Sequence, residues 1–156
     1  MKTVFQGDVF ADYHQFYLAD ADSETDYSND VTDEAIAQRI VSKDDVLVVF
    51  TARNFYVPVR VELHETEPSL PLDQADHVVV ASLRSTGTIV IAGCTDYRRD
   101  ATRFSVPPGY LRVAIVFTGL DTVSRSDGGL EGDDRYTLHL WPGKAGIQVL
   151  KQALGV

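Results

Sequence analysis

From residue 45 onward the chain is a succession of short segments rich in Val, Ile and aromatic residues, each followed by turn-forming residues. Such segments are typical of β-strands, because β-branched and aromatic side chains pack well on a pleated surface. The Gly, Pro, Asp and Ser residues between them suit hairpins and the longer connections of a Greek key. The predicted strands are residues 45–52, 57–63, 77–83, 87–93, 102–106, 110–117 and 136–141.

The order of apolar and polar residues indicates how these strands are buried. Residues 57–63 alternate strictly between apolar and polar side chains, which predicts one buried and one exposed face. Residues 46–50 are apolar at every position, which is typical of a strand in the middle of a layer. An eighth strand is predicted over residues 11–20, with Phe16 and Leu18 on one face and Tyr13 and Tyr17 on the other.

One segment, residues 32–43, has a helical pattern. Thr32 is suited to cap its start, and Asp33 and Glu34 suit the positive end of a helix dipole. Ile36 and Ile40 are four residues apart and would form a narrow apolar stripe. The sequence therefore predicts a mainly β fold, a β-sandwich of about eight strands with one short α-helix. At 156 residues, 44% of them hydrophobic, the chain suits a single domain over residues 1–156.

The negative charge of the chain is concentrated near its start. The formal net charge is -9, and residues 1–34 hold nine acids against one lysine, whereas the rest of the chain is nearly balanced. This charge argues against direct binding of nucleic acid or an anionic membrane, because both carry the same sign. A basic protein is the partner that the charge favours. We treat residues 19–34 as an acidic segment and residues 120–156 as a carboxy-terminal extension.

Within the acidic segment, Asp20, Asp22, Glu24 and Asp26 occupy every second position. Three interpretations compete: a calcium loop, a solvated linker, and an anionic surface. Calcium is disfavoured, because neither register of an EF-hand loop has the Gly that its sixth position needs. If the segment is extended, alternate carboxylates point the same way roughly 6.5 to 7 Å apart.

An anionic surface of this kind would suit a groove that grips phosphates through Lys and Arg. Tyrosines near the row would supply the apolar contacts that charges alone do not provide. The predicted partner-binding residues are Asp20, Asp22, Glu24, Asp26, Asp33, Glu34, Tyr13, Tyr17 and Tyr27.

No motif predicts catalysis, a metal or a cofactor. The four histidines lack the close spacing of a metal site, and the chain has no nucleophile elbow and no phosphate-binding glycine loop. The single cysteine, Cys94, excludes an internal disulfide and is expected to be a buried small residue. The arginines, which include Arg84, Arg98 and Arg103, are expected to pair with carboxylates. The apolar runs are too short for a signal peptide or a bilayer span, which predicts a cytoplasmic protein that meets a membrane only through its partner.

Two short segments, "YHQFYL" (13–18) and "TDEAI" (32–36), occur in an order that resembles the competence-J family, which are inhibitors of the bacterial DNA-entry nuclease. The resemblance continues through "VLVVFTARN", "VPVRVEL" and "FSVPPGYLRVAIVF" and covers roughly residues 11–118. The chain departs from the family at Val31, where an aromatic residue is expected, and in a longer acidic insert. The resemblance implies a small non-enzymatic protein that binds a nuclease and blocks it.

The function predicted from the sequence is therefore that of a non-enzymatic inhibitor or immunity-type protein, which uses its acidic surface as a phosphate mimic. Its expected partner is a basic protein, a nuclease. An alternative is a ligand-binding β-sandwich that holds a carbohydrate or lipid headgroup on exposed aromatic residues, with calcium as an optional component. A structural subunit recruited through its sheet edges is a third hypothesis.

Overall fold

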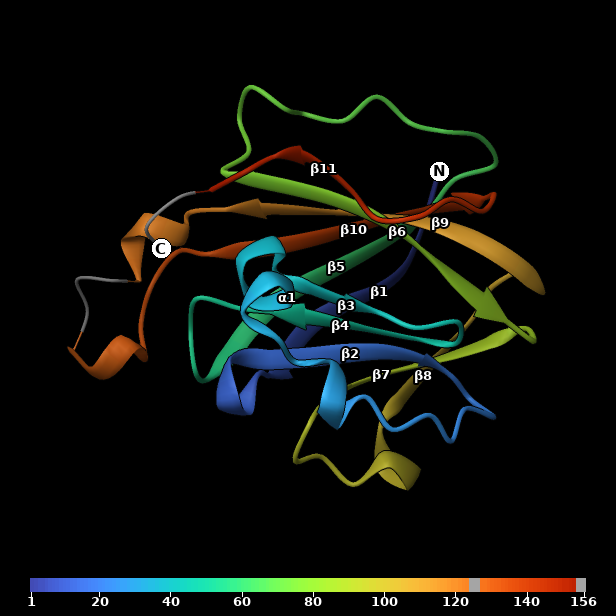
Figure 1. The fold of residues 1–156 in the computed structure, drawn as a ribbon, viewed down its shortest axis with the longest axis horizontal. Helices are drawn as coiled ribbons and strands as arrows, with labels where there is room; N and C mark the ends of the chain where they lie inside the picture. The colour runs from blue at the N-terminus through green and yellow to red at the C-terminus, as the bar shows by residue number, and fades with distance from the viewer. Residues whose placement is uncertain (124–126, 154–156) are drawn as a thin grey trace.

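The protein, in a computed structural model that describes residues 1–123 and 127–153, is built from two β-sheets. Strands make up 48% and helices 13%, which confirms the mainly β prediction. Figure 1 shows the sheets as two stacked layers. In spatial order, the six-stranded sheet contains β1 (Lys2–Phe10), β5 (Tyr56–Leu63), β10 (Arg135–Pro142), β9 (Gly109–Thr118), β6 (His77–Ser85) and β11 (Gln148–Lys151). The five-stranded sheet contains β3 (Ile40–Ser42), β4 (Val46–Phe50), β2 (Gln15–Asp20), β7 (Thr88–Gly93) and β8 (Thr102–Ser105).

The described residues form eleven strands rather than about eight, because each of the eight predicted segments contains a strand and β1, β3 and β11 are additional. β1 is an edge strand whose apolar residues are interrupted by Gln6, Gly7 and Asp8. β10 lies in the centre of its sheet, parallel to β5 and antiparallel to β9. The residues after 120 therefore include a central strand of the sandwich, and residues 124–126 and 154–156 of that segment lie outside the described part.

The main core lies between the two sheets. Val57, Val59 and Val61 face it, as their alternation predicts, and each is at most 2% exposed. A second cluster lies on the outer face of the five-stranded sheet, where it includes Tyr17 and Val48. This second cluster explains why β4 is apolar on both faces: the residues that follow β2 cover its outer side.

The helix α1 (Asp33–Gln38) begins as predicted and ends earlier. Its first turn is capped by Thr32, whose Oγ1 accepts a hydrogen bond from the Ala35 backbone N–H at 3.1 Å. It ends at Arg39, which has a left-handed backbone with φ of 64°. The predicted continuation to residue 43 is wrong, and so is the stripe, because Ile36 is 50% exposed and Ile40 belongs to β3. β-branched residues after the cap are more stable in the sheet, where Ile40 pairs with Val49 of β4.

The remaining helical elements are single 3₁₀ turns that connect the strands. They are η1 (Asp12–His14), η2 (Ser28–Asp30), η3 (Arg98–Asp100), η4 (Leu120–Thr122) and η5 (Asp127–Gly129). Across the described residues, no helix combines the length and the apolar character that crossing a membrane requires.

Candidate partner-binding surface

The acidic segment lies on the outer face of the five-stranded sheet and is attached to it by side-chain contacts. Thr25 Oγ1 donates a hydrogen bond to Asp45 Oδ1 at 2.6 Å. The Tyr27 hydroxyl donates to Gln15 Oε1 at 3.4 Å, and the Tyr27 ring centroid lies 6.4 Å from that of Tyr17. These contacts favour a surface over a solvated linker.

Asp20, the first acid of the row, points into the protein. Its side chain is only 2% exposed. Asp20 Oδ1 accepts hydrogen bonds from the backbone N–H of Thr86 at 2.7 Å and from the Thr86 hydroxyl at 2.9 Å. The Asp22 backbone N–H donates to the other oxygen, Asp20 Oδ2, at 3.2 Å. Asp20 therefore holds the turn between β6 and β7 against the end of β2.

The next three acids retain the alternation that the sequence predicts. Asp22, Glu24 and Asp26 are exposed, whereas Ser23 between them is buried and Thr25 is half-buried. The Ser28 backbone N–H donates to Asp26 Oδ1 at 2.9 Å, and this bond lowers the pKa of Asp26 below its usual value. The three carboxylates thus form an exposed row, which we call the acidic row.

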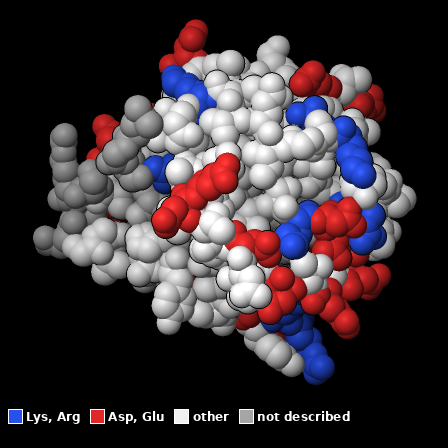
Figure 2. Space-filling view, in the orientation of Figure 1, with Lys and Arg blue, Asp and Glu red and all other residues white. Residues whose placement is uncertain are grey.

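The acids at the start of α1 extend the negative surface. Asp33 and Glu34 are exposed. Asp30 lies 3.3 Å from Lys43, and within the described part of the chain this is the single ion pair of residues 20–34. Figure 2 shows acidic and basic side chains interspersed at the end of the sandwich that carries the turn between β3 and β4. The exposed negative charge therefore lies beside, and is not removed by, the protein's own cations.

The three predicted tyrosines have different environments. Tyr13, in η1, is 69% exposed and has a left-handed backbone with φ of 57°. Tyr17 is 8% exposed, lies beneath the Arg98 guanidinium at 5.9 Å, and has a pKa raised by burial. Burial raises the pKa of Tyr27 to about 12. Tyr13 is available to a partner, whereas Tyr17 and Tyr27 hold the acidic segment on the sheet.

The arginines follow the predicted pairing only in part. Arg84 pairs with Asp44 at 2.6 Å, as expected. Arg98 instead donates from Nη2 to the backbone carbonyl of Asp20 at 2.9 Å. Arg103, in β8, donates to two backbone carbonyls of the preceding loop, at 2.9 and 3.2 Å. For Arg98 and Arg103 the predicted carboxylate pairing is wrong, because among the described residues neither forms an ion pair and both donate to backbone carbonyls instead.

The register of strand pairing places further aromatic side chains at one end of the sandwich. Gln15 pairs with Phe50 and Phe16 with Gly93, so η1, the loop after β4 and the loop after β7 lie together. The exposed aromatic residues of this end are Tyr13, Phe55, Tyr56 and Tyr97. Sequence reasoning missed the last three, although "RNFY" (53–56) and "TDY" (95–97) place aromatic residues beside turn-forming ones, which is a usable signal.

The remaining candidate groups show no catalytic arrangement. His64 Nε2 and His139 Nδ1 lie 2.9 Å apart and share a hydrogen bond on the outer face of the six-stranded sheet. No group of three metal-ligating side chains occurs among the residues that the structure describes. Cys94 is half-buried, donates from Sγ to the Asp12 carbonyl at 3.3 Å, and has a pKa raised by burial. Its thiolate form is therefore disfavoured.

These features define a class: a two-layer β-sandwich in which the five-stranded sheet carries an acidic cover on its outer face. Among solved structures, the chain is similar to ComJ, inhibitor of the DNA-degrading activity of NucA, from Bacillus subtilis. The TM-score is 0.69 at 20% sequence identity, over 91% of this chain and 98% of ComJ. The resemblance to the competence-J family is therefore confirmed at the level of the fold.

A second solved structure, described as "Crocagin biosynthetic gene J", matches with a TM-score of 0.62 at 16% identity, over 92% of this chain and 98% of that one. A scan of family models found no match. A search of curated proteins likewise found no significant match. The comparisons with solved structures therefore show the fold of this chain. An argument about a binding partner has to come from the residues of the acidic segment and the exposed aromatic side chains.

Proposed function

We propose that this protein is a non-enzymatic inhibitor that binds a nuclease and covers the basic cleft in which that nuclease holds DNA. The observation that carries the proposal is the acidic row. Its members Asp22, Glu24 and Asp26 are exposed, and no ion pair within the described residues involves them. The fold shared with ComJ, itself an inhibitor of a DNA-degrading activity, supports the same function.

A nuclease cleft is a suitable target for such a row. DNA carries about one negative charge per 1.7 Å of its axis, so a protein that grips it must present several cations. Carboxylates on a structured surface can pair with those cations in place of phosphates, and the opposing charges accelerate association. The exposed ring of Tyr13 adds an apolar contact of the kind that dominates the energy of interfaces.

The test uses a variant that removes charge from the acidic row without changing side-chain size: Asp22→Asn, Glu24→Gln and Asp26→Asn together. If each carboxylate contributes about 0.5 to 1 kcal/mol, the Kd rises roughly 10- to 100-fold. Inhibition of DNA degradation is measured with two nucleases. One is NucA, and the other is captured from extracts of the protein's own source on the immobilised parent protein at low salt.

A matched control removes the same charge from another face. Glu65, Glu67 and Asp73 are exposed acids of the segment between β5 and β6, and no described residue forms an ion pair with them. The variant Glu65→Gln, Glu67→Gln and Asp73→Asn is expected to inhibit like the parent. Equal loss of inhibition in both variants would mean that only net charge matters. A parent protein that inhibits neither nuclease refutes the proposal.

A further inference from the structure

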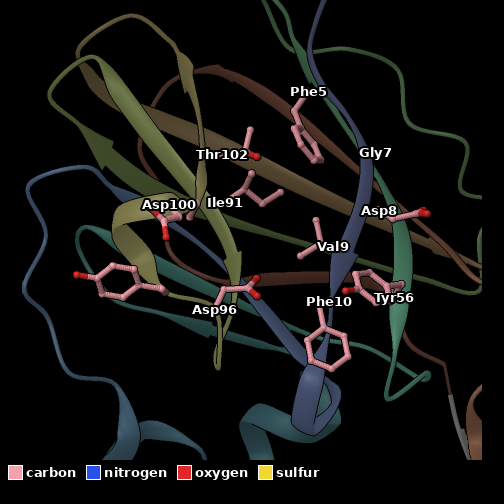
Figure 3. A pocket seen from close by; sticks show the side chains of 12 residues that line it. Phe5, Gly7, Asp8, Val9, Phe10, Tyr56, Ile91, Asp96, Asp100 and Thr102 are labelled. Atoms are coloured by element: carbon pink, nitrogen blue, oxygen red, sulfur yellow. The ribbon is translucent and has the colours of Figure 1, made fainter.

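A pocket of about 420 Å³ lies between β1 and the strands β7 and β8, where the two sheets approach each other at an edge. Its volume falls within the range of ligand sites, about 300 to 1,000 Å³. Figure 3 shows Phe5, Val9 and Ile91 lining its interior between the ribbons of β1 and β7. The interior is therefore apolar.

Gly7 is the reason that the pocket exists. It pairs with Val59, between Phe5 and Val9, so that it occupies a position whose side chain would face the other sheet. A Cβ at Gly7 would lie 3.5 Å from the Phe5 ring, which is an ordinary van der Waals distance. An added Cβ therefore meets no clash, and a larger side chain at this position would extend toward the pocket that Gly7 lines. A glycine inside a strand marks a bulge, a bend, or a site where a ligand or another backbone approaches closely.

The mouth of the pocket carries negative charge. Asp96 and Asp100 line it from the side of β7 and β8, and none of the described residues that line it is basic. Asp96 Oδ2 accepts a hydrogen bond from the Gly93 backbone N–H at 2.8 Å, which fixes that carboxylate in place. Asp8 projects away from the pocket in Figure 3 and does not contribute to this charge.

The arginines that lie close to Asp96 and Asp100 in the sequence are engaged elsewhere. Arg98 donates to the Asp20 carbonyl at 2.9 Å, and the Arg99 guanidinium lies over the Tyr97 ring, 5.8 Å from its centroid. Arg103, in β8, donates two hydrogen bonds to backbone carbonyls of residues 99 and 101. None of the three forms an ion pair with Asp96 or Asp100 in the described part of the chain. The charge at the mouth is therefore available to a cation from outside.

The Phe5 ring adds an aromatic surface to the interior on the β1 side. Phe10 and Tyr56, which pair with each other and have ring centroids 4.9 Å apart, lie at the rim on the strand face that also carries Asp8. A cation near such rings is attracted by their negative faces, most strongly when water is excluded. An aliphatic stem is expected to lie against the apolar interior, as the stems of Lys and Arg do on apolar surfaces.

We propose that this pocket receives a Lys or Arg side chain of the basic partner, with its stem against Phe5 and Ile91 and its cationic group at Asp96 and Asp100. The inference rests on the proposed function for the source of that side chain. Its chemistry follows from an apolar interior that includes the Phe5 ring, and from an acidic mouth. An anion would be repelled there, and a neutral apolar ligand would leave the acids unpaired.

The first experiment uses a small probe and needs no partner. n-Butylguanidinium and the neutral n-butylurea are titrated separately into the parent protein, and backbone amide shifts are followed by NMR. Saturable shifts at Gly7, Ile91 and Asp96 are expected with the guanidinium probe, with binding at least about tenfold weaker for the urea. Equal binding of both probes would overturn the proposal.

The matched variants are Gly7→Val, which extends a side chain toward the pocket, and Gly146→Val, which adds the same side chain at a position with no atom within 4 Å. Gly7→Val is expected to abolish the saturable shifts while retaining the amide dispersion of the folded parent, and Gly146→Val to leave them unchanged. Asp100→Asn is expected to weaken binding of the guanidinium probe about tenfold. Retained binding in Gly7→Val would overturn the proposal, whatever the result for nuclease inhibition.

The second experiment connects the pocket to the partner. In the nuclease assay, Gly7→Val is expected to raise the concentration needed for half-inhibition about tenfold, and Gly146→Val to have no effect. Probe binding together with unchanged inhibition by Gly7→Val would overturn the assignment of the ligand to the partner. Failure of the parent protein to inhibit any nuclease would instead refute the proposed function, while the probe titration still decides the chemistry of the pocket.

Discussion

Replacement of Asp20 separates structural acids from those available for docking. The Asp20 carboxylate is only 2% exposed and accepts two short hydrogen bonds from Thr86, at 2.7 and 2.9 Å. The substitution Asp20→Ala removes this acceptor. A hydrogen bond to a charged group contributes about 1.5 to 3 kcal/mol. Counting only these two bonds at the lower value, we expect a loss of about 3 kcal/mol in the free energy of unfolding.

This loss corresponds to a decrease in Tm of roughly 6 to 12 °C for a domain of this length. Asp20→Asn keeps an oxygen for the Thr86 backbone N–H and is expected to cost about 1 kcal/mol. Asp22→Ala, at an exposed position, is the control and should change stability by less than about 0.5 kcal/mol. Urea unfolding can be followed by the fluorescence of the single tryptophan, Trp141, which is 4% exposed.

The same variants test the surface assignment. Folded Asp20→Asn is expected to inhibit a nuclease as the parent does, because its carboxylate faces the protein interior. An Asp20→Ala variant as stable as the parent would refute the structural reasoning. A folded Asp20→Asn variant with normal stability and lost inhibition would show that Asp20 contacts the partner instead.

Two further predictions concern the packing of the sandwich. Burial lowers the pKa of His77, whose neutral ring donates from Nε2 to the Gln38 carbonyl at 2.9 Å and accepts at Nδ1 from the Ala153 backbone N–H at 3.0 Å. The unfolded chain then binds the proton more readily, so the free energy of unfolding should decrease as pH falls below about 6.5. Urea titrations at several pH values measure this decrease, which should be smaller in the variant His77→Gln. Gly93→Ala should prevent folding or lower the free energy of unfolding by more than about 3 kcal/mol, because the added Cβ would overlap the Phe10 carbonyl oxygen. A thermal melt by circular dichroism with a Tm near that of the parent would contradict this close approach.

Most of the fold can be predicted from the sequence because strand-forming residues are grouped between turns. The exceptions have physical causes. β1 contains Gly7 and Asp8, which are poor strand formers, and becomes a strand only through its pairing with β5. Residues 39–43 continue a helical pattern, but the left-handed backbone of Arg39 turns the chain so that Ile40 and Val41 join the sheet. Tertiary pairing decides the structure in both places.

The candidate site is predictable in composition and less so in orientation. The exposure of Asp22, Glu24 and Asp26 follows from alternation along an extended segment. The inward turn of Asp20 depends on Thr86, which is 66 residues away in the chain, and no local pattern reveals that contact. The aromatic end of the sandwich depends in the same way on strand register, which sequence alone does not fix.

The central position of β10 has a consequence for how the protein is made. This strand comes from residues 135–142 and lies between β9, which closely precedes it in the chain, and β5, which is synthesised much earlier. Until it emerges from the ribosome, β5 and β9 each have one unpaired edge and an incompletely covered apolar face. Pairing of β5 with β10 closes a long loop, so folding is expected to be slow and largely post-translational. The nascent chain would therefore depend on chaperones or on rapid completion of synthesis to avoid aggregation.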